Sequence, residues 1–194
     1  PMDVAMSDDG KTMQVLYLYT QEGKITSKVI YYNFGEAGEE ETDHQVIEKQ
    51  YENTIMASGF YMDDMTSVAI GDNQMSIFQG NDKPKETASV KIDKEIKSVF
   101  HSDQYIGFVL KNKNSSGYEL RLYNTNGKQV MSEKFDGTYD HVKYADDQII
   151  MYDGKKCSIY KKNGIHKFEG SMDNKILEIL PVQGVNKYIV ISKD

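Results

Sequence analysis

Residues 118–130, YELRLYNTNGKQV, carry a hairpin pattern from which the fold of the chain can be inferred. Apolar and polar side chains alternate through Leu122, the pair Asn126-Gly127 follows, and a second run begins at Gln129. Asn-Gly favours a two-residue type I′ turn, because both central positions of that turn need a positive φ. The pattern therefore predicts a β-hairpin closed by a type I′ turn.

The same strand–turn–strand pattern recurs along the chain. Three apolar-aromatic pairs precede a glycine-containing turn at spacings of 45 and 37 residues: Ile77-Phe78 before Gly80, Leu122-Tyr123 before Gly127, and Ile159-Tyr160 before Gly164. The preceding strands repeat as well, since Tyr105, Ile149 and Tyr188 are 44 and 39 residues apart. A period of about 40 residues with four short strands per unit is typical of a β-propeller blade.

The repeat predicts an all-β chain of about four and a half blades, each blade a sheet of four antiparallel strands. We expect one partial propeller domain over residues 1–194, whose fifth unit stops after its second strand. Such a chain is expected to be a piece of a larger propeller, which would form an open arc or close only with another copy. Exposed apolar faces on its end blades would promote self-association.

Two structural alternatives accompany this interpretation. A β-sandwich also has short strands with regular turns, but it does not require one pattern to recur in phase, so the period favours the propeller. Locally, Gln45–Lys49 is expected to be the fourth strand of the first unit, whereas 44–53 could instead form a short helical turn.

Charge and hydropathy limit the classes of partner. The 194 residues include 23 Lys and Arg against 30 Asp and Glu, a formal net charge of −7. An acidic surface repels phosphates, so we expect no nucleic-acid partner. No run reaches the roughly 18 apolar residues of a membrane span, and no signal-peptide pattern is present.

Several groups of residues could in principle bind a metal or take part in catalysis, but the sequence around them predicts structural roles. The acidic run 35–43 lacks the oxygen spacing of a calcium loop and is predicted to be a solvated hairpin loop. Cys157, the single cysteine, lies in an expected strand and is predicted to be a small buried hydrophobe. The motif Ser7-x-Asp9-Gly10 is similar to the Asp-box of sialidase propellers, but the residue between Asp and Gly and the Trp are absent, so a β-turn is predicted.

Candidate acid–base and metal-binding residues are equally unpromising. Asp63 and Asp64 are adjacent, and neighbouring residues of an extended segment point to opposite sides, so they cannot face one sugar as a catalytic pair. The four histidines show no metal-ligand spacing; they are His44, His101, His141 and His166. His101 and His141 both flank inner-strand positions and could meet near a propeller axis. We therefore assign no catalytic, cofactor-binding or metal-binding residue, and expect no cofactor.

The chain resembles an uncharacterised bacterial family of surface propellers, similar to quinoprotein-like and WD40-like propellers, that an N-terminal transmembrane helix anchors to the cell. The likeness rests on DVAMSDDGK at residues 3–11 and SKVIYYNF at residues 27–34, and on the repeats that follow Ile96. The resemblance implies an extracellular, cell-surface location, with the anchor and the first half of the ectodomain outside this chain. It implies no activity and no site residues.

These observations lead to two hypotheses about function. The first is a non-enzymatic interaction module that binds a protein or a cell-envelope glycan, in which some of the 14 tyrosines would contact the ligand through an apolar ring and a polar tip. The alternative is a propeller glycoside hydrolase or lyase whose catalytic residues lie mostly outside the chain. Carboxylates converging on a central funnel would favour the enzyme.

Overall fold

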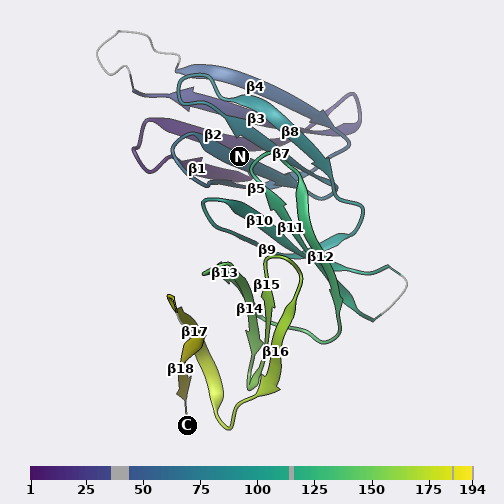
Figure 1. The fold of residues 1–194 in the computed structure, drawn as a ribbon. Helices are drawn as coiled ribbons and strands as arrows, with labels where there is room; N and C mark the ends of the chain where they lie inside the picture. The colour runs from purple at the N-terminus through teal and green to yellow at the C-terminus, as the bar shows by residue number, and fades with distance from the viewer. Residues whose placement is uncertain (36–43, 114–115, 185, 194) are drawn as a thin grey trace. The chain divides into compact units, whose positions relative to one another are not determined.

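The computed structural model describes residues 1–35, 44–113, 116–184 and 186–193. They form eighteen strands, and sixteen of these build four antiparallel sheets of four strands each (Figure 1). The predicted propeller blades are therefore confirmed, and the β-sandwich is not the arrangement found. This part of the chain contains no helix long and apolar enough to cross a bilayer.

The chain divides into two compact units, residues 1–95 with 125–127, and residues 96–124 with 128–194. The first unit holds two sheets, whose strands are β1 (Asp3–Met6), β2 (Thr12–Gln21), β3 (Lys24–Asn33) and β4 (Gln45–Glu52), then β5 (Met56–Tyr61), β6 (Thr66–Gly71), β7 (Gln74–Gln79) and β8 (Lys85–Lys91). Since β4 is a strand, the helical alternative for residues 44–53 is wrong.

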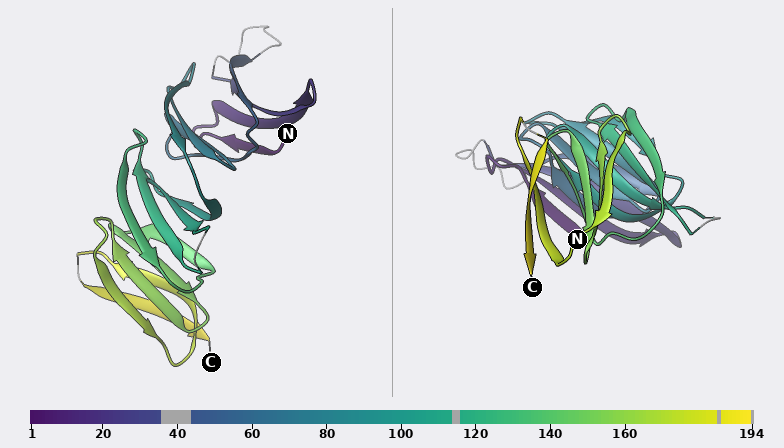
Figure 2. Two further views of the ribbon diagram at one scale, coloured as in Figure 1. Left: turned by 90° about the vertical axis from the view of Figure 1, so that its right-hand side faces the viewer. Right: turned by 60° about the horizontal axis from the view of Figure 1, so that its bottom comes forward.

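The second unit holds the third and fourth sheets and a two-stranded one. Its strands are β9 (Glu95–His101, whose first residue falls in the first unit), β10 (Tyr105–Lys111), β11 (Tyr118–Asn124) and β12 (Gln129–Phe135), then β13 (His141–Ala145), β14 (Gln148–Asp153), β15 (Lys156–Lys161) and β16 (His166–Ser171), and finally β17 (Lys175–Val182) and β18 (Lys187–Lys193). The fifth blade thus has two strands, as the repeat predicts. Figure 2 shows the unit's three sheets one after another.

Each interface between successive sheets of a unit has its own apolar core. Leu16, Val29 and Tyr31 of the first sheet pack with Met56 and Phe78 of the second. In the second unit one core joins the sheets β9–β12 and β13–β16, and another joins β13–β16 to β17–β18. Because the central strands of a blade are covered on both faces, β6, β10 and β14 are almost entirely buried along their length.

The opening hairpin forms, but its turn differs from the prediction. Only Gly127 (φ 74°) takes the left-handed conformation, and Asn126 does not. Lys128 donates a backbone hydrogen bond to the Asn124 side chain (3.0 Å), and the register shifts so that Tyr123 pairs with Gln129 and Leu122 with Met131. The loop of residues 125–128 is longer than the two residues of a type I′ turn, and the register shift beyond it leaves Val130 unpaired as a β-bulge.

The same bulge marks all four complete blades. The register between the third and fourth strands shifts at Tyr31/Tyr32, Ile77/Phe78, Leu122/Tyr123 and Ile159/Tyr160. Three of these are the apolar-aromatic pairs that define the sequence repeat. The period in the sequence is thus the period of a recurring bulge, which increases the twist of the outer hairpin in each blade.

Candidate functional site

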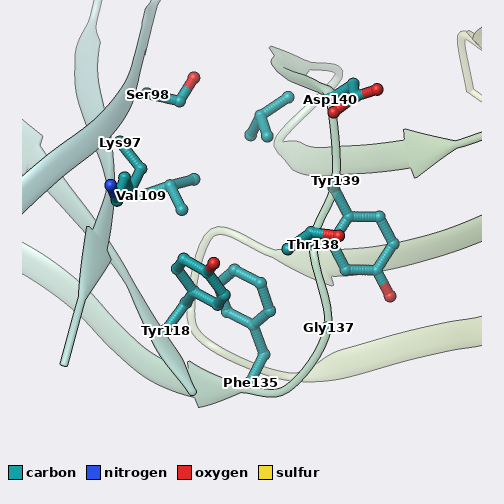
Figure 3. A pocket seen from close by; sticks show the side chains of 10 residues that line it. Lys97, Ser98, Val109, Tyr118, Phe135, Gly137, Thr138, Tyr139 and Asp140 are labelled. Atoms are coloured by element: carbon teal, nitrogen blue, oxygen red, sulfur yellow. The ribbon is translucent and has the colours of Figure 1, made fainter. Parts of the chain in front are cut away.

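A pocket of about 240 Å³ opens in the second unit, between the sheets β9–β12 and β13–β16 (Figure 3). Its lining comes from β9, β10, β11, β12 and β13 and from the loop that joins β12 to β13. Val109 and Val142 contribute apolar surface, and Val109 also belongs to the core beneath the pocket. The pocket is therefore built on packed strands of two neighbouring blades.

Three aromatic rings form one wall of the pocket. Tyr118 begins β11 and Phe135 ends β12, and these residues are direct cross-strand partners, so both side chains lie on the same face of the sheet. Their rings stack with centroids 5.7 Å apart and planes 23° from parallel, and the Tyr139 ring lies 5.9 Å from Phe135. All three are half-buried and pack against the core, so they are rigid surfaces that still face the pocket.

The β12–β13 loop positions Tyr139. Gly137 has a φ of 92°, which side-chain-bearing residues rarely adopt, and it turns the chain so that Thr138 and Tyr139 line the pocket. Burial and the nearby charge of Glu169 raise the pKa of Tyr139, although a hydrogen bond with Ser158 opposes this shift. The phenol therefore stays protonated at neutral pH.

Polar side chains lie away from the Tyr118–Phe135 pair. In Figure 3, Ser98 and Asp140 lie at the opposite end of the pocket, Lys97 at one side, and the 137–140 loop along the other. Lys97 and Asp140 are exposed and Ser98 is half-buried. An aromatic wall with hydroxyl, ammonium and carboxylate groups around it suits a ligand that has one apolar face and a polar periphery.

The carboxylates considered from sequence stabilise turns in the first unit. Asp63 accepts backbone hydrogen bonds from Met65 (2.8 Å) and Thr66 (2.6 Å), and Asp64 accepts one from the backbone of Asp9 (3.0 Å). The Ser7 hydroxyl donates to Asp9 (2.7 Å) in the turn that Gly10 closes, as predicted. None of these residues lines the aromatic pocket.

Aromatic rings pack against His44, His141 and His166. His44 contacts Phe34, His141 stacks on Tyr152, and His166 stacks on Tyr160 and hydrogen-bonds with Ser158 (2.9 Å). Burial lowers the pKa of the fourth histidine, His101.

The remaining candidates also have structural settings or fall outside the structure. Cys157 is buried, which confirms its predicted place in the core, and burial raises the pKa of its thiol. The described residues contain no cluster of three or more His, Cys, Asp or Glu side chains placed to hold a metal ion. Residues 36–43 of the acidic run 35–43 lie outside the described residues.

Sequence reasoning did not find the pocket. Its residues come from five strands and a loop in two successive repeats, and they meet only when the two sheets pack. One signal was present, the segment FDGTYD at residues 135–140, where two aromatic residues flank a glycine turn between blades.

Comparisons with known proteins bear on the fold and the family. The sequence profile of a family of unknown function, DUF5711, matches residues 1–194. The chain belongs to this family. No curated protein matches the chain in sequence.

Solved structures resemble the DUF5711 chain in fold. A HIRA fragment spanning its residues 644–1017 superposes with a TM-score of 0.53 at 8% identity, covering 84% of this chain and 52% of that one. An oligogalacturonate lyase in complex with manganese superposes with a TM-score of 0.53 at 11% identity, covering 88% of this chain and 53% of that one. The N-terminal domain of Nup159 superposes with a TM-score of 0.50 at 8% identity, covering 88% of this chain and 44% of that one. The chain thus spans about half the length of these structures. At such identities the likeness concerns the propeller-type fold alone.

Proposed function

We propose that this chain is the ligand-binding part of a non-enzymatic interaction module, which acts outside the cytoplasm on a protein or a glycan of the cell envelope. The observation that carries the proposal is the half-buried aromatic wall of Tyr118, Phe135 and Tyr139, held rigid against the core yet facing a pocket. Rigid aromatic side chains give large contact areas at low cost in conformational entropy, which is why they dominate recognition surfaces.

The chemistry of the site favours binding over catalysis. The Tyr139 phenol stays protonated at neutral pH, so it does not supply a general base. The carboxylates considered for glycoside hydrolysis, Asp63 and Asp64, lie in a turn of the other unit and accept backbone hydrogen bonds there. The extracytoplasmic location is supported only by the family resemblance described above.

The test compares the wild-type chain with a Thr138→Arg variant that fills the mouth of the pocket. Thr138 is exposed, so the variant is expected to fold. The matched control is Thr20→Arg, a similar change at an exposed strand position of the first unit. Immobilised protein is incubated with soluble glycan and protein extracts of bacterial envelopes.

We expect components that the wild type and Thr20→Arg retain to be lost from Thr138→Arg by at least tenfold. Equal retention by all three proteins would contradict the role of this pocket. Release of shortened glycans during the incubation would instead support the alternative function, glycoside hydrolysis or elimination.

A further inference from the structure

We infer that the aromatic pocket binds one ring of an uncharged saccharide, seated with its C–H face on the Tyr118–Phe135 wall. This inference rests on the proposed function, because it names the ligand class of the same site. Hexoses and N-acetylhexosamines carry C–H groups on the faces of the ring and hydroxyl groups around its edge. The pocket has a complementary arrangement, with aromatic rings at one end, Ser98 and Asp140 at the opposite end, and polar groups along the sides between them.

The aromatic wall provides the stacking surface. Aromatic faces carry partial negative charge, and the C–H groups of a sugar ring carry partial positive charge, so the two surfaces attract as they exclude water. The rings of Tyr118 and Phe135 stack nearly parallel, 23° apart, so each ring supports the other in the wall. Because both rings also pack against the core, little side-chain freedom is lost when a ligand binds.

The polar groups match sugar hydroxyls, which both donate and accept hydrogen bonds. Asp140 can only accept, Lys97 can only donate, and the hydroxyls of Ser98 and Thr138 can do either. One cation and one anion near the pocket give no net preference for a charged ligand. The chain as a whole carries a formal net charge of −7, which disfavours the binding of polyanionic glycans such as uronate polymers.

The size of the pocket favours a ring over an extended peptide. A volume of about 240 Å³ is below the roughly 300–1,000 Å³ of sites that enclose drug-sized ligands. A peptide bound in extended form needs a longer groove with pockets for alternate side chains. A single terminal or internal sugar residue fits the hollow, with the rest of a glycan outside it.

The experiment uses the whole chain and defined probes. Binding of neutral trisaccharides of β-linked glucose, galactose and N-acetylglucosamine, and of a trigalacturonate, is followed by saturation-transfer NMR and calorimetry. The variants are Phe135→Leu, which keeps an apolar side chain but removes the ring, and Phe168→Leu, the same change at a 43%-exposed position on β16 outside the pocket. Proton–nitrogen correlation spectra establish that each variant is folded.

We expect at least one neutral trisaccharide to bind, with saturation transfer strongest at ring C–H protons. Phe135→Leu should weaken that binding at least tenfold, and Phe168→Leu should leave it within twofold. Tighter binding of trigalacturonate, or equal losses in both variants, would overturn the inference. If no neutral trisaccharide binds while Thr138→Arg still abolishes retention of envelope components, the saccharide assignment is wrong and the proposed function stands. If no neutral trisaccharide binds and Thr138→Arg also has no effect on retention, both the saccharide assignment and the proposed function are wrong.

Discussion

At the scale of single residues, Gly107 on β10 leaves space for an aromatic ring. A Cβ atom built at this position would lie 2.0 Å from the Phe100 ring, which is 5% exposed and belongs to the core between β9–β12 and β13–β16. We expect Gly107→Ala to lower the free energy of unfolding by about 1–3 kcal/mol, because a buried ring cannot move aside without repacking. Chemical denaturation followed by far-UV circular dichroism measures this loss.

A double-mutant cycle separates this clash from other effects of a Cβ atom. In a Phe100→Ala background the ring is gone, so Gly107→Ala should cost less than about 0.5 kcal/mol. Additive losses in the double variant would show that the ring is not the obstacle.

Glu86 links the two sheets of the first unit through charged hydrogen bonds. Its carboxylate accepts from Lys49 Nζ (2.5 Å) and from the Tyr51 hydroxyl (2.9 Å), both on β4. Burial alone would raise the pKa of Glu86, but hydrogen bonds from Lys49, Ser76 and Tyr51 outweigh it and lower the pKa below its ordinary value of 4.5. Glu86 therefore stabilises the fold above pH 4.5, and this contribution is lost as the pH falls through the lowered pKa of the folded state.

Replacing the Glu86 carboxylate should therefore change the free energy of unfolding by an amount that depends on pH. We expect Glu86→Gln to lower the free energy of unfolding by about 1 kcal/mol at pH 7, a modest value because Lys49 is 45% exposed. The difference from the wild type should shrink as the pH falls below 4.5. Denaturation at a series of pH values measures it, and Glu22→Gln in the exposed β2–β3 turn is the control, with no such trend expected. A constant difference from pH 7 to pH 3 would contradict the assignment.

At the scale of elements, the bulged outer hairpin depends on a left-handed glycine. Gly164 follows β15 with a φ of 89°, and its backbone N–H donates to the Lys161 carbonyl (2.9 Å). Gly164→Ala should destabilise the chain by about 1 kcal/mol, since a Cβ atom strains this conformation, whereas Gly164→Asn should cost less because asparagine tolerates it better. Thermal unfolding compares the two variants, and an equal loss in both would show that the conformation is not what matters.

The same hairpins show how far the sequence determines the elements. The pairs Ile77-Phe78, Leu122-Tyr123 and Ile159-Tyr160 predicted the third strand of three blades and, in the structure, mark the bulge of each. The type I′ turn was wrong because Asn-Gly is a local preference, whereas the loop length is set by which residue of β12 pairs with Tyr123. The aromatic pocket was not predictable either, because its residues come together only when two successive repeats pack against each other.

At the scale of the whole molecule, stability should decline toward the two-stranded sheet of the second unit. That sheet is held by Ile176 and Ile179 in the core with β14 and β15, and by the Tyr188 hydroxyl, which accepts a hydrogen bond from Lys167 (2.6 Å) and donates one to Gln148. Two strands bury less surface than four, and an isolated pair is marginal in water. Its outer strand β18 also exposes Ile189 and Ile191 by 55% and 47%.

Native-state hydrogen exchange should reveal this gradient. We expect the amides of β17 and β18 to exchange at least tenfold faster than those of the central strands β14 and β15, because local opening of a two-stranded sheet exposes less buried surface. Ile179→Ala, which truncates a side chain that is 1% exposed, should accelerate exchange in β17–β18 while β10 and β11 stay protected. Ile189→Ala is the matched control on the exposed face and should leave the pattern unchanged. Uniform exchange across the unit's three sheets would mean that they open together, and the two-stranded sheet would then be as firmly held as a complete blade.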